Sequence, residues 1–304
     1  MKTILYYITD HGRGHATRSI AIIKELQKCN TNVIIRNSNL KKKLENSLQN
    51  TKIISGKTDI GPKIKPDGFS IDNKNSKKDI HNWIKNLKNT AEKEKGNISK
   101  IKPDLIISDI SVMPFLTAKN NKINSIAISN FSWFDVLKFL DSSDLEILKN
   151  VYDFSDLAIQ LPFGTSMNHF KNKIKVGVVA REPTKSIKNI RNKLKLKNHE
   201  SLISFATGGS EIKINCDFEK NVKILSMDSK IVGSNVIKLP KSIASQDAIS
   251  ASNLVIGKCG YGLISECCTN GIPFYYLGDN AHLEQNAMMK EIQKYPGQEK
   301  ELEK

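Results

Sequence analysis

Short apolar runs alternate with stretches of helical periodicity along the chain. Residues 3–8 form a continuous apolar run of strand length, and residues 16–28 then repeat apolar positions at helical spacing. Further strand-like runs follow at residues 104–108, 125–129, 202–206 and 254–256. Such alternation predicts an α/β fold in which parallel sheets carry helices on both faces.

The alternation occurs in two halves joined near residues 162–180. We therefore predict two facing, doubly wound Rossmann-like domains, with bounds at residues 1–165 and 175–304. In such sheets ligands bind beyond the carboxyl ends of the strands, so the loops that follow strands are the candidate sites. Residues 56–79 are polar and predict a long loop of functional type, followed by one polar helix over residues 80–100.

Composition excludes several protein classes. Of the 304 residues, 39% are hydrophobic and 26% charged, as in a globular protein and unlike a disordered or fibrous one. The longest apolar runs have about six residues, too few for a spanning helix, which needs roughly 20. The five cysteines share no metal-ligand spacing, and the N-terminus does not have the pattern of a signal peptide. We therefore expect a cytoplasmic protein.

The net charge of +16 is concentrated in two lysine-rich segments, residues 41–102 and 171–197, each of net charge +9. Only five arginines occur, and base readers favour bidentate arginine, so we do not expect nucleic acid as a partner. The two segments could attract an anionic membrane at its inner face or a phosphorylated substrate. The alternative is a lysine-rich, solvated surface.

A glycine-rich loop, Thr9-Asp-His-Gly-Arg-Gly-His15, separates the first strand from the first helix. Gly12 and Gly14 let the backbone turn tightly and approach a ligand, and a helix N-terminus attracts anions. His15 lies at that terminus, which favours the neutral imidazole, and a neutral histidine can act as a base. The loop lacks the third glycine of a dinucleotide fingerprint. The alternative is a glycine-rich turn with a capping histidine.

Two further candidates end strands of the same predicted sheet. Asp109 lies where a catalytic carboxylate would fit, although a strand-end aspartate commonly caps the next helix. Asn130 and Trp133 follow the next strand, in the sequence Asn-Phe-Ser-Trp. Trp133 either stacks on an acceptor or fills the interior of the domain.

The second half contains an anion-binding loop of its own, Gly257-Lys-Cys-Gly-Tyr-Gly262, in which Lys258 adds charge. Glu266 follows one turn into the next helix, where its carboxylate can accept two ribose hydroxyls. The alternative is a surface glutamate favoured by the helix dipole. Gly208 and Gly209 follow another strand and line the same cleft or form a plain turn.

The last helix begins with Glu284 and Gln285. A carboxylate and an amide at this position suit hydrogen bonds to a polyol. The alternative is the ordinary polarity of a helix N-terminus.

Together these motifs resemble the GT-B glycosyltransferases. The resemblance is nearest to the family 28-like branch with the peptidoglycan N-acetylglucosaminyltransferase, and to the glycosyltransferase-like N-terminal part of arabinokinase homologues. The motifs, in the family's order, are HGRGHATR (residues 11–18), PDLIISD (103–109), NFSW (130–133), GKCGYGLISE (257–266) and EQNA (284–287).

The resemblance implies a UDP-linked nucleotide sugar, bound chiefly by the second domain without a metal or other cofactor. Glu266 matches the residue that holds the ribose, and Glu284 and Gln285 match the pair that contacts the donor sugar. The helix start with Lys258, Gly260 and Gly262 matches the pyrophosphate site. The expected donor-binding residues are all of these together with Gly12, Gly14, Gly208 and Gly209.

On the other domain, His15 matches the base of the family's first loop, with Asp109 as a second catalytic candidate. Arg18, Asn130 and Trp133 are then expected on the acceptor side. The expected activity is transfer of a hexose or N-acetylhexosamine to a hydroxyl acceptor, with a lipid-linked acceptor as one candidate. The first rival interpretation is a nucleotide-sugar hydrolase, because the G-x-G-H-x-x-R pattern also resembles the hydrolases of sialic-acid-like sugar biosynthesis. The second is a non-catalytic nucleotide-sugar-binding protein, because the C-terminal half is short for the family.

Overall fold

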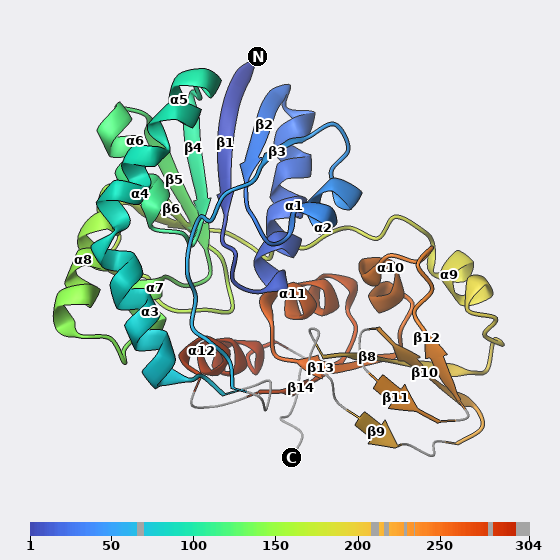
Figure 1. The fold of residues 1–304 in the computed structure, drawn as a ribbon. Coiled ribbons are helices and arrows are strands. Elements are labelled where there is room, and N and C mark those ends of the chain that lie inside the picture. Colours follow the sequence, from blue (N-terminus) through green and yellow to red (C-terminus); the bar gives the residue numbers. More distant parts are fainter. Residues whose placement is uncertain are drawn as a thin grey trace. The chain divides into compact units, whose positions relative to one another are not determined.

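A computed structural model describes residues 1–65, 70–207, 213–215, 219–227, 230–233, 235–278 and 282–295. The chain divides into two units (Figure 1). The first comprises Met1–Val179 with His282–Glu284, and the second comprises the described parts of residues 180–281 and 285–304.

The first unit is built on a seven-stranded parallel sheet of order β3-β2-β1-β4-β5-β6-β7. Its strands are β1 (Lys2–Ile8), β2 (Thr31–Arg36), β3 (Lys52–Ile54), β4 (Leu105–Asp109), β5 (Asn124–Ser129), β6 (Leu157–Gln160) and β7 (Lys173–Lys175). The chain runs outward from β1 to β3, then returns to β4 on the other side of β1. The strand order therefore reverses between β1 and β4, which makes their carboxyl ends the topological switch point where such sheets bind ligands.

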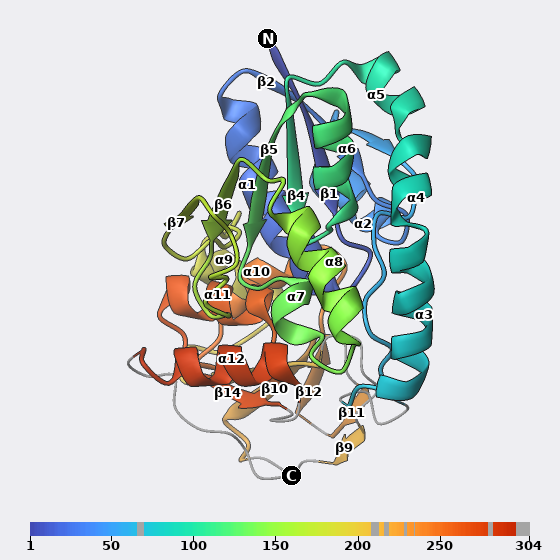
Figure 2. The ribbon, with the colours of Figure 1, turned by 90° about the vertical axis from the view of Figure 1, so that its left-hand side faces the viewer.

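Eight helices of the first unit are described: α1 (Arg13–Lys28), α2 (Lys41–Ser47), α3 (Asn73–Lys85), α4 (Leu87–Lys93), α5 (Lys95–Ile101), α6 (Met113–Asn121), α7 (Trp133–Val136) and α8 (Ser142–Tyr152). Figures 1 and 2 show α3, α4 and α5 following one another along one side of the sheet. The apolar row of α1, with Ala16, Ile20 and Ile23, is buried as its spacing predicts.

The predicted single helix over residues 80–100 is wrong, because the structure has three helices with interruptions at Asn86 and Glu94. Glu94 is 6% exposed and accepts hydrogen bonds from Arg36 Nε and Tyr7 Oη, both at 3.0 Å. A buried carboxylate needs such partners, and the interruption coincides with this inward-facing residue. The preceding loop is also shorter than predicted, since α3 begins at Asn73.

The second unit has a five-stranded parallel sheet of order β12-β10-β8-β13-β14 and a two-stranded sheet, β11-β9. Its strands are β8 (Ser201–Ala206), β9 (Lys213–Asn215), β10 (Val222–Ser226), β11 (Lys230–Val232), β12 (Val236–Lys238), β13 (Leu254–Lys258) and β14 (Phe274–Leu277). Its helices are α9 (Ile187–Lys193), α10 (Ser245–Ser250) and α11 (Tyr261–Asn270), while α12 (Leu283–Ile292) begins in the piece grouped with the first unit.

The predicted α/β fold with two doubly wound parallel sheets is confirmed. In the parts of the chain that the structure describes, no helix combines the length and apolar content needed to cross a membrane.

Candidate functional site

The switch point of the first sheet gathers polar residues from three loops. β1 pairs with β4, and β4 pairs with β5, so the segments that follow these strands lie at one edge. His15 lies in the first turn of α1, just after β1, and Asp109 is the last residue of β4. Asn130 directly follows β5. Residues far apart in the sequence are thereby brought together.

The imidazole of His15 contacts the carboxylate of Asp109, with Nδ1 2.8 Å from Oδ1. His15 is 5% exposed and Asp109 is fully buried. The turn before α1 depends on Gly12, which has a φ of 73°, a conformation that side chains disfavour. The side chain of His15 thus meets a carboxylate in place of the capping role considered above, and its Nδ1 is held in a defined orientation.

Arg18, one helical turn after His15, donates two hydrogen bonds to the same carboxylate. Its Nε donates to Asp109 Oδ2 at 2.8 Å, and its Nη2 donates to Oδ1 at 2.5 Å. Nη2 also lies 2.9 Å from Ser129 Oγ and 2.6 Å from His15 Nδ1. Nη1 donates to Asn130 Oδ1. Such bidentate pairing fixes a carboxylate in both position and plane.

The ionisation of Asp109 follows from this arrangement. Burial alone would raise the pKa of the carboxyl, but the charges and hydrogen bonds of Arg18 and His15 outweigh burial and hold the pKa well below its usual range. Ser19 Oγ adds a further hydrogen bond to Oδ2 at 2.9 Å. Asp109 is therefore a permanent anion beneath His15 at physiological pH.

The three residues expected on the acceptor side are all buried. Arg18 and Trp133 are 1% exposed, and Asn130 is fully buried and donates from Nδ2 to the carbonyl of Phe163. Of the two alternatives for Trp133, the structure has the one in which the indole fills the interior. These side chains pack beneath the site and do not present an open surface for stacking.

Sequence reasoning missed Asp59, which follows β3 and is 1% exposed. Its Oδ2 accepts hydrogen bonds from Trp133 Nε1 at 2.5 Å and Thr9 Oγ1 at 3.1 Å. Nothing local in the polar stretch around it distinguishes Asp59 from an exposed loop residue. The chemistry becomes visible only when the fold places it beside Trp133.

In the second unit, Glu266 lies in α11 and is 2% exposed. Arg181 Nε donates to Glu266 Oε1 at 2.7 Å, and Arg181 Nη2 donates to Ser245 Oγ at 2.9 Å. The expectation of a surface glutamate is thus excluded. Arg181 was also missed by sequence reasoning, where it counted only as one of the basic residues of a charged segment.

The turn before α11 is shorter than expected. β13 continues through Lys258, and α11 begins at Tyr261 with Gly260 as its N-cap, so Gly262 lies within the helix. Lys258 is half-buried. The start of α11 directly after a parallel strand keeps the geometry in which helix N-terminal N–H groups attract anions.

The remaining predicted donor-side residues are only partly described. Gly208 and Gly209 lie outside the described residues. Gly14 is half-buried in the first turn of α1, and Glu284 and Gln285 lie in the first turn of α12, half-buried and buried respectively. Among the residues that the structure describes, no group of three His, Cys, Asp or Glu side chains could hold a metal ion.

Comparison with known proteins gives one family. The model described as "Glycosyl transferase family 1" matches residues 2–295. A curated relative, an L-arabinokinase of Arabidopsis thaliana, is 26% identical over 294 residues, which cover 90% of this chain. The match covers only 28% of that relative, so the chain corresponds to about a quarter of its length.

Solved glycosyltransferases share the fold at low sequence identity. The spinosyn rhamnosyltransferase SpnG complexed with thymidine diphosphate superposes with a TM-score of 0.63 at 10% identity, covering 96% of this chain and 84% of that one. The glycosyltransferase SnogD from Streptomyces nogalater gives a TM-score of 0.63 at 10% identity, with 96% and 86% covered. The structural neighbours are GT-B glycosyltransferases, which confirms the expected fold family.

The buried Asp109 pair predicts how stability depends on pH. Asp109→Asn leaves the Arg18 charge uncompensated and should lower the free energy of unfolding by about 3–5 kcal/mol at pH 7. Since the folded-state pKa of Asp109 is depressed, its stabilisation is present above the unfolded pKa of about 3.9 and is lost as pH falls below it. Denaturant unfolding should therefore show the same gap between wild type and variant at pH 7 and pH 5, and a narrower gap at pH 3.5.

Asp104→Asn is the matched control, because this exposed strand-edge carboxylate pairs with Lys2 at 2.7 Å. Its effect should be much smaller at every pH. A constant gap between wild type and Asp109→Asn across the three pH values would contradict the assignment of Asp109 as the ionised partner.

Proposed function

Because the chain belongs to glycosyl transferase family 1, we propose that it transfers a sugar from a nucleotide-sugar donor to a hydroxyl group of an acceptor. One observation carries this proposal: the His15–Asp109 pair lies at the switch point of the first sheet. A sugar hydroxyl is a poor nucleophile until a base removes its proton. A histidine oriented by a buried anion supplies such a base.

In the proposed mechanism, His15 carries its proton on Nδ1, and this N–H donates a hydrogen bond to Asp109 Oδ1. Arg18 Nη2 lies within reach of Asp109 Oδ1, Ser129 Oγ and His15 Nδ1 but carries only two hydrogens. In this tautomer the two hydrogens are donated to Asp109 and Ser129, because Nδ1 of His15 already carries a proton. Nε2 of His15 is then the nitrogen that accepts the acceptor's proton. Asp109 stabilises the imidazolium that forms and stays ionised throughout.

We propose that the second unit binds the donor. Glu266 would accept the ribose hydroxyls, with Arg181 fixing the carboxylate through Oε1. The diphosphate would lie at the start of α11, next to Lys258, where the helix dipole and N–H groups stabilise the leaving group without a metal. Glu284 and Gln285 would contact the sugar. The thymidine diphosphate complex of SpnG supports a nucleoside diphosphate as the ligand class, and UDP is our first choice.

Incubation with candidate nucleotide sugars and separation of the products tests the proposal against its rivals. Transfer gives a new glycoside, a nucleotide-sugar hydrolase gives free sugar, and a binding protein gives neither product despite measurable binding. Free sugar as the sole product in the presence of hydroxyl acceptors would replace the transferase proposal with the hydrolase.

The role of His15 predicts a selective loss. His15→Ala should lower turnover by about 10²–10⁴-fold, the usual contribution of a general base, while donor affinity stays nearly unchanged. His81→Ala is the matched control: its Nδ1 also lies 2.8 Å from a carboxylate, that of Asp144, but on the helical side of the first unit. Turnover by steady-state assay and donor affinity by calorimetry check both variants.

Full activity in His15→Ala would remove His15 from the mechanism. His15→Asn separates a chemical role from a local structural one, since asparagine suits the end of a helix but cannot act as the base. It should be as inactive as the alanine variant.

The role of Glu266 predicts a change in ribose discrimination. Glu266→Gln should weaken nucleoside diphosphate binding by about 1.5–3 kcal/mol, because a charged acceptor is lost. In wild type, a 2′-deoxy nucleotide should show part of the same loss, and in the variant the two nucleotides should bind alike. Calorimetry on both proteins checks this. An undiminished preference for the ribonucleotide in Glu266→Gln would contradict the assignment.

We also propose that the helices α3–α5 contact an anionic membrane surface. Exposed lysines occur in each of these helices, among them Lys74, Lys78 and Lys85 in α3, Lys88 in α4 and Lys95 in α5. Within α3, the intervals of four and seven residues keep these lysines on one side of the helix. This basic stripe would bring the site to a lipid-linked acceptor.

Reversing charge at Lys78, Lys85, Lys88 and Lys95 should abolish sedimentation with vesicles that contain anionic lipid. Binding of the wild-type chain should need that lipid and weaken with salt, since the Debye length is roughly 10 Å at 0.1 M. Four reversals among the lysines of residues 171–197 serve as the control. Equal sedimentation with neutral and anionic vesicles would favour a solvated surface.

A further inference from the structure

Asp59 is a buried carboxyl that the proposed mechanism does not use. Its Oδ1 accepts a hydrogen bond from the backbone N–H of Ile60 at 2.9 Å. Its Oδ2 accepts from Thr9 Oγ1 and from the indole of Trp133. Within the described ranges, no lysine, arginine or histidine forms an ion pair with it. Burying a carboxylate with neutral donors alone costs free energy of folding. We therefore asked what function this side chain serves.

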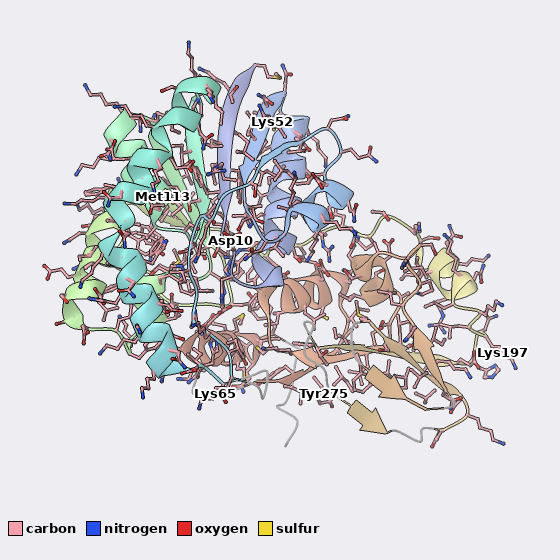
Figure 3. The ribbon with its side chains drawn as sticks, viewed as in Figure 1. Asp10, Lys52, Lys65, Met113, Lys197 and Tyr275 are labelled. Carbon is pink, nitrogen blue, oxygen red and sulfur yellow. The ribbon has the colours of Figure 1, made fainter. Side chains whose placement is uncertain are left out.

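The segment that carries Asp59 crosses the carboxyl edge of the first sheet. It leaves β3 and reaches the end of β1, where Thr58 donates from N to Asp10 Oδ2 at 3.0 Å and from Oγ1 to the carbonyl of Ile8 at 2.8 Å. Figure 3 labels Asp10 at this position. Gly61 then packs on the ring of His11, because an added Cβ would lie 2.2 Å from Nδ1. The segment is therefore anchored to the loop that leads to α1.

A series of ring contacts extends from Trp133 to His15. Trp133 meets Phe131 edge to face, with centroids 5.6 Å apart and planes at 70°. Phe131 meets the imidazole of His15 in the same way, at 5.6 Å and 73°. Edge-to-face pairs have a preferred geometry, so the orientation of one ring restricts the next. The imidazole of His15 thus contacts Asp109 through Nδ1 and packs against Phe131, the last ring of this series.

We propose that Asp59 is a positioning residue for His15: it fixes the Trp133 indole, which acts on the imidazole through Phe131, and it anchors the first loop through Thr9. The chain of contacts begins at two hydrogen bonds to one oxygen of Asp59 and ends at the ring proposed as the base. This inference rests on the proposed function for its catalytic meaning. Its structural content stands on the packing alone.

The residue type suits this role. Both oxygens of Asp59 accept hydrogen bonds, and only a carboxylate offers two acceptor oxygens at one position. Asparagine has the same shape but presents an amide N–H₂ in place of one oxygen. Asp59→Asn therefore sets a donor against Ile60 N–H or against Trp133 and Thr9. The substitution changes hydrogen bonding at nearly constant volume.

Other titratable groups face this position. Burial raises the pKa of Asp59 to about 7, so its protonation state changes near neutrality. His11 lies 5.4 Å from Trp133 between ring centroids, and Asp10 contacts the same segment. Tyr152 Oη accepts from Trp133 N at 3.1 Å, but burial holds its pKa well above 10. His11 is the group whose titration must be separated from that of Asp59.

The experiment reads the indole and the imidazole by NMR, without any donor. The chain has two tryptophans, Trp83 and Trp133, so Trp83→Phe leaves one indole N–H signal. With Asp59 intact, that signal should titrate with a midpoint near 7. In Asp59→Asn the titration should vanish, and the indole N–H should exchange with solvent roughly tenfold faster, as expected for one lost hydrogen bond.

A His11→Gln variant should keep the titration, which assigns it to Asp59. The imidazole signals of His15, identified by their absence in His15→Ala, should shift in Asp59→Asn. They should shift likewise in Trp133→Phe, which keeps an aromatic ring without the N–H. Asp79→Asn is the control, because this half-buried carboxylate pairs with Lys63, and the substitution should leave the His15 signals in place.

Unchanged His15 signals in both Asp59→Asn and Trp133→Phe would overturn the proposal, as would a titration that disappears in His11→Gln. If Asp59→Asn does not fold, the His15 signals of Trp133→Phe and the pH titration of the Trp83→Phe protein still test the proposal. The failure of this inference is distinct from failure of the proposed function, because these signals are recorded without substrate.

With a donor that the chain turns over, Asp59→Asn should lower turnover roughly 10- to 100-fold, the effect of a displaced catalytic group, with donor affinity unchanged. In a His15→Ala background the same substitution should have no further effect. Equal losses in both backgrounds would show that Asp59 acts on general stability and would overturn its positioning role.

Discussion

The site of the first unit depends on a single buried ion pair, the two-pronged contact between Arg18 and Asp109. Both side chains are at most 1% exposed, so neither charge can be satisfied by water. Each therefore requires the other, and both then impose positions on their neighbours. The carboxylate orients His15, and the guanidinium holds Ser129 and Asn130. Breaking the pair would leave an unpaired charge in the interior, which costs more than the contact itself contributes.

The fold makes this pair possible. In a doubly wound sheet the strand order reverses once, and here the reversal separates β1 from β4. Asp109 ends β4, and α1 begins just beyond β1, so the two partners approach from either side of the reversal. The second unit also pairs a buried carboxylate with an arginine, but the two residues come from distant parts of the chain. Glu266, buried within α11, is paired with Arg181, which lies 85 residues earlier in the chain.

The sequence predicted what depends on local pattern. Alternating apolar runs indicated both parallel sheets, and the position of His15 and Asp109 after buried strands indicated a common edge. Burial could not be predicted, because it depends on which loops cover the edge. Trp133 was therefore ambiguous until Asp59, 74 residues earlier, was found against its indole. The burial of Glu94, where the helix is interrupted, was missed for the same reason, since its partner Arg36 lies on a distant strand.

The base candidate and its support share one helix. His15 and Arg18 are three residues apart on α1, so both move with it as a rigid body. Adding or removing one residue between them would turn one side chain by roughly 100° relative to the other. The interval between His15 and Arg18 should therefore be constant in related chains that keep this site, with no insertion or deletion between the two residues. The repeat of the helix thus sets the relative orientation of the imidazole and the guanidinium.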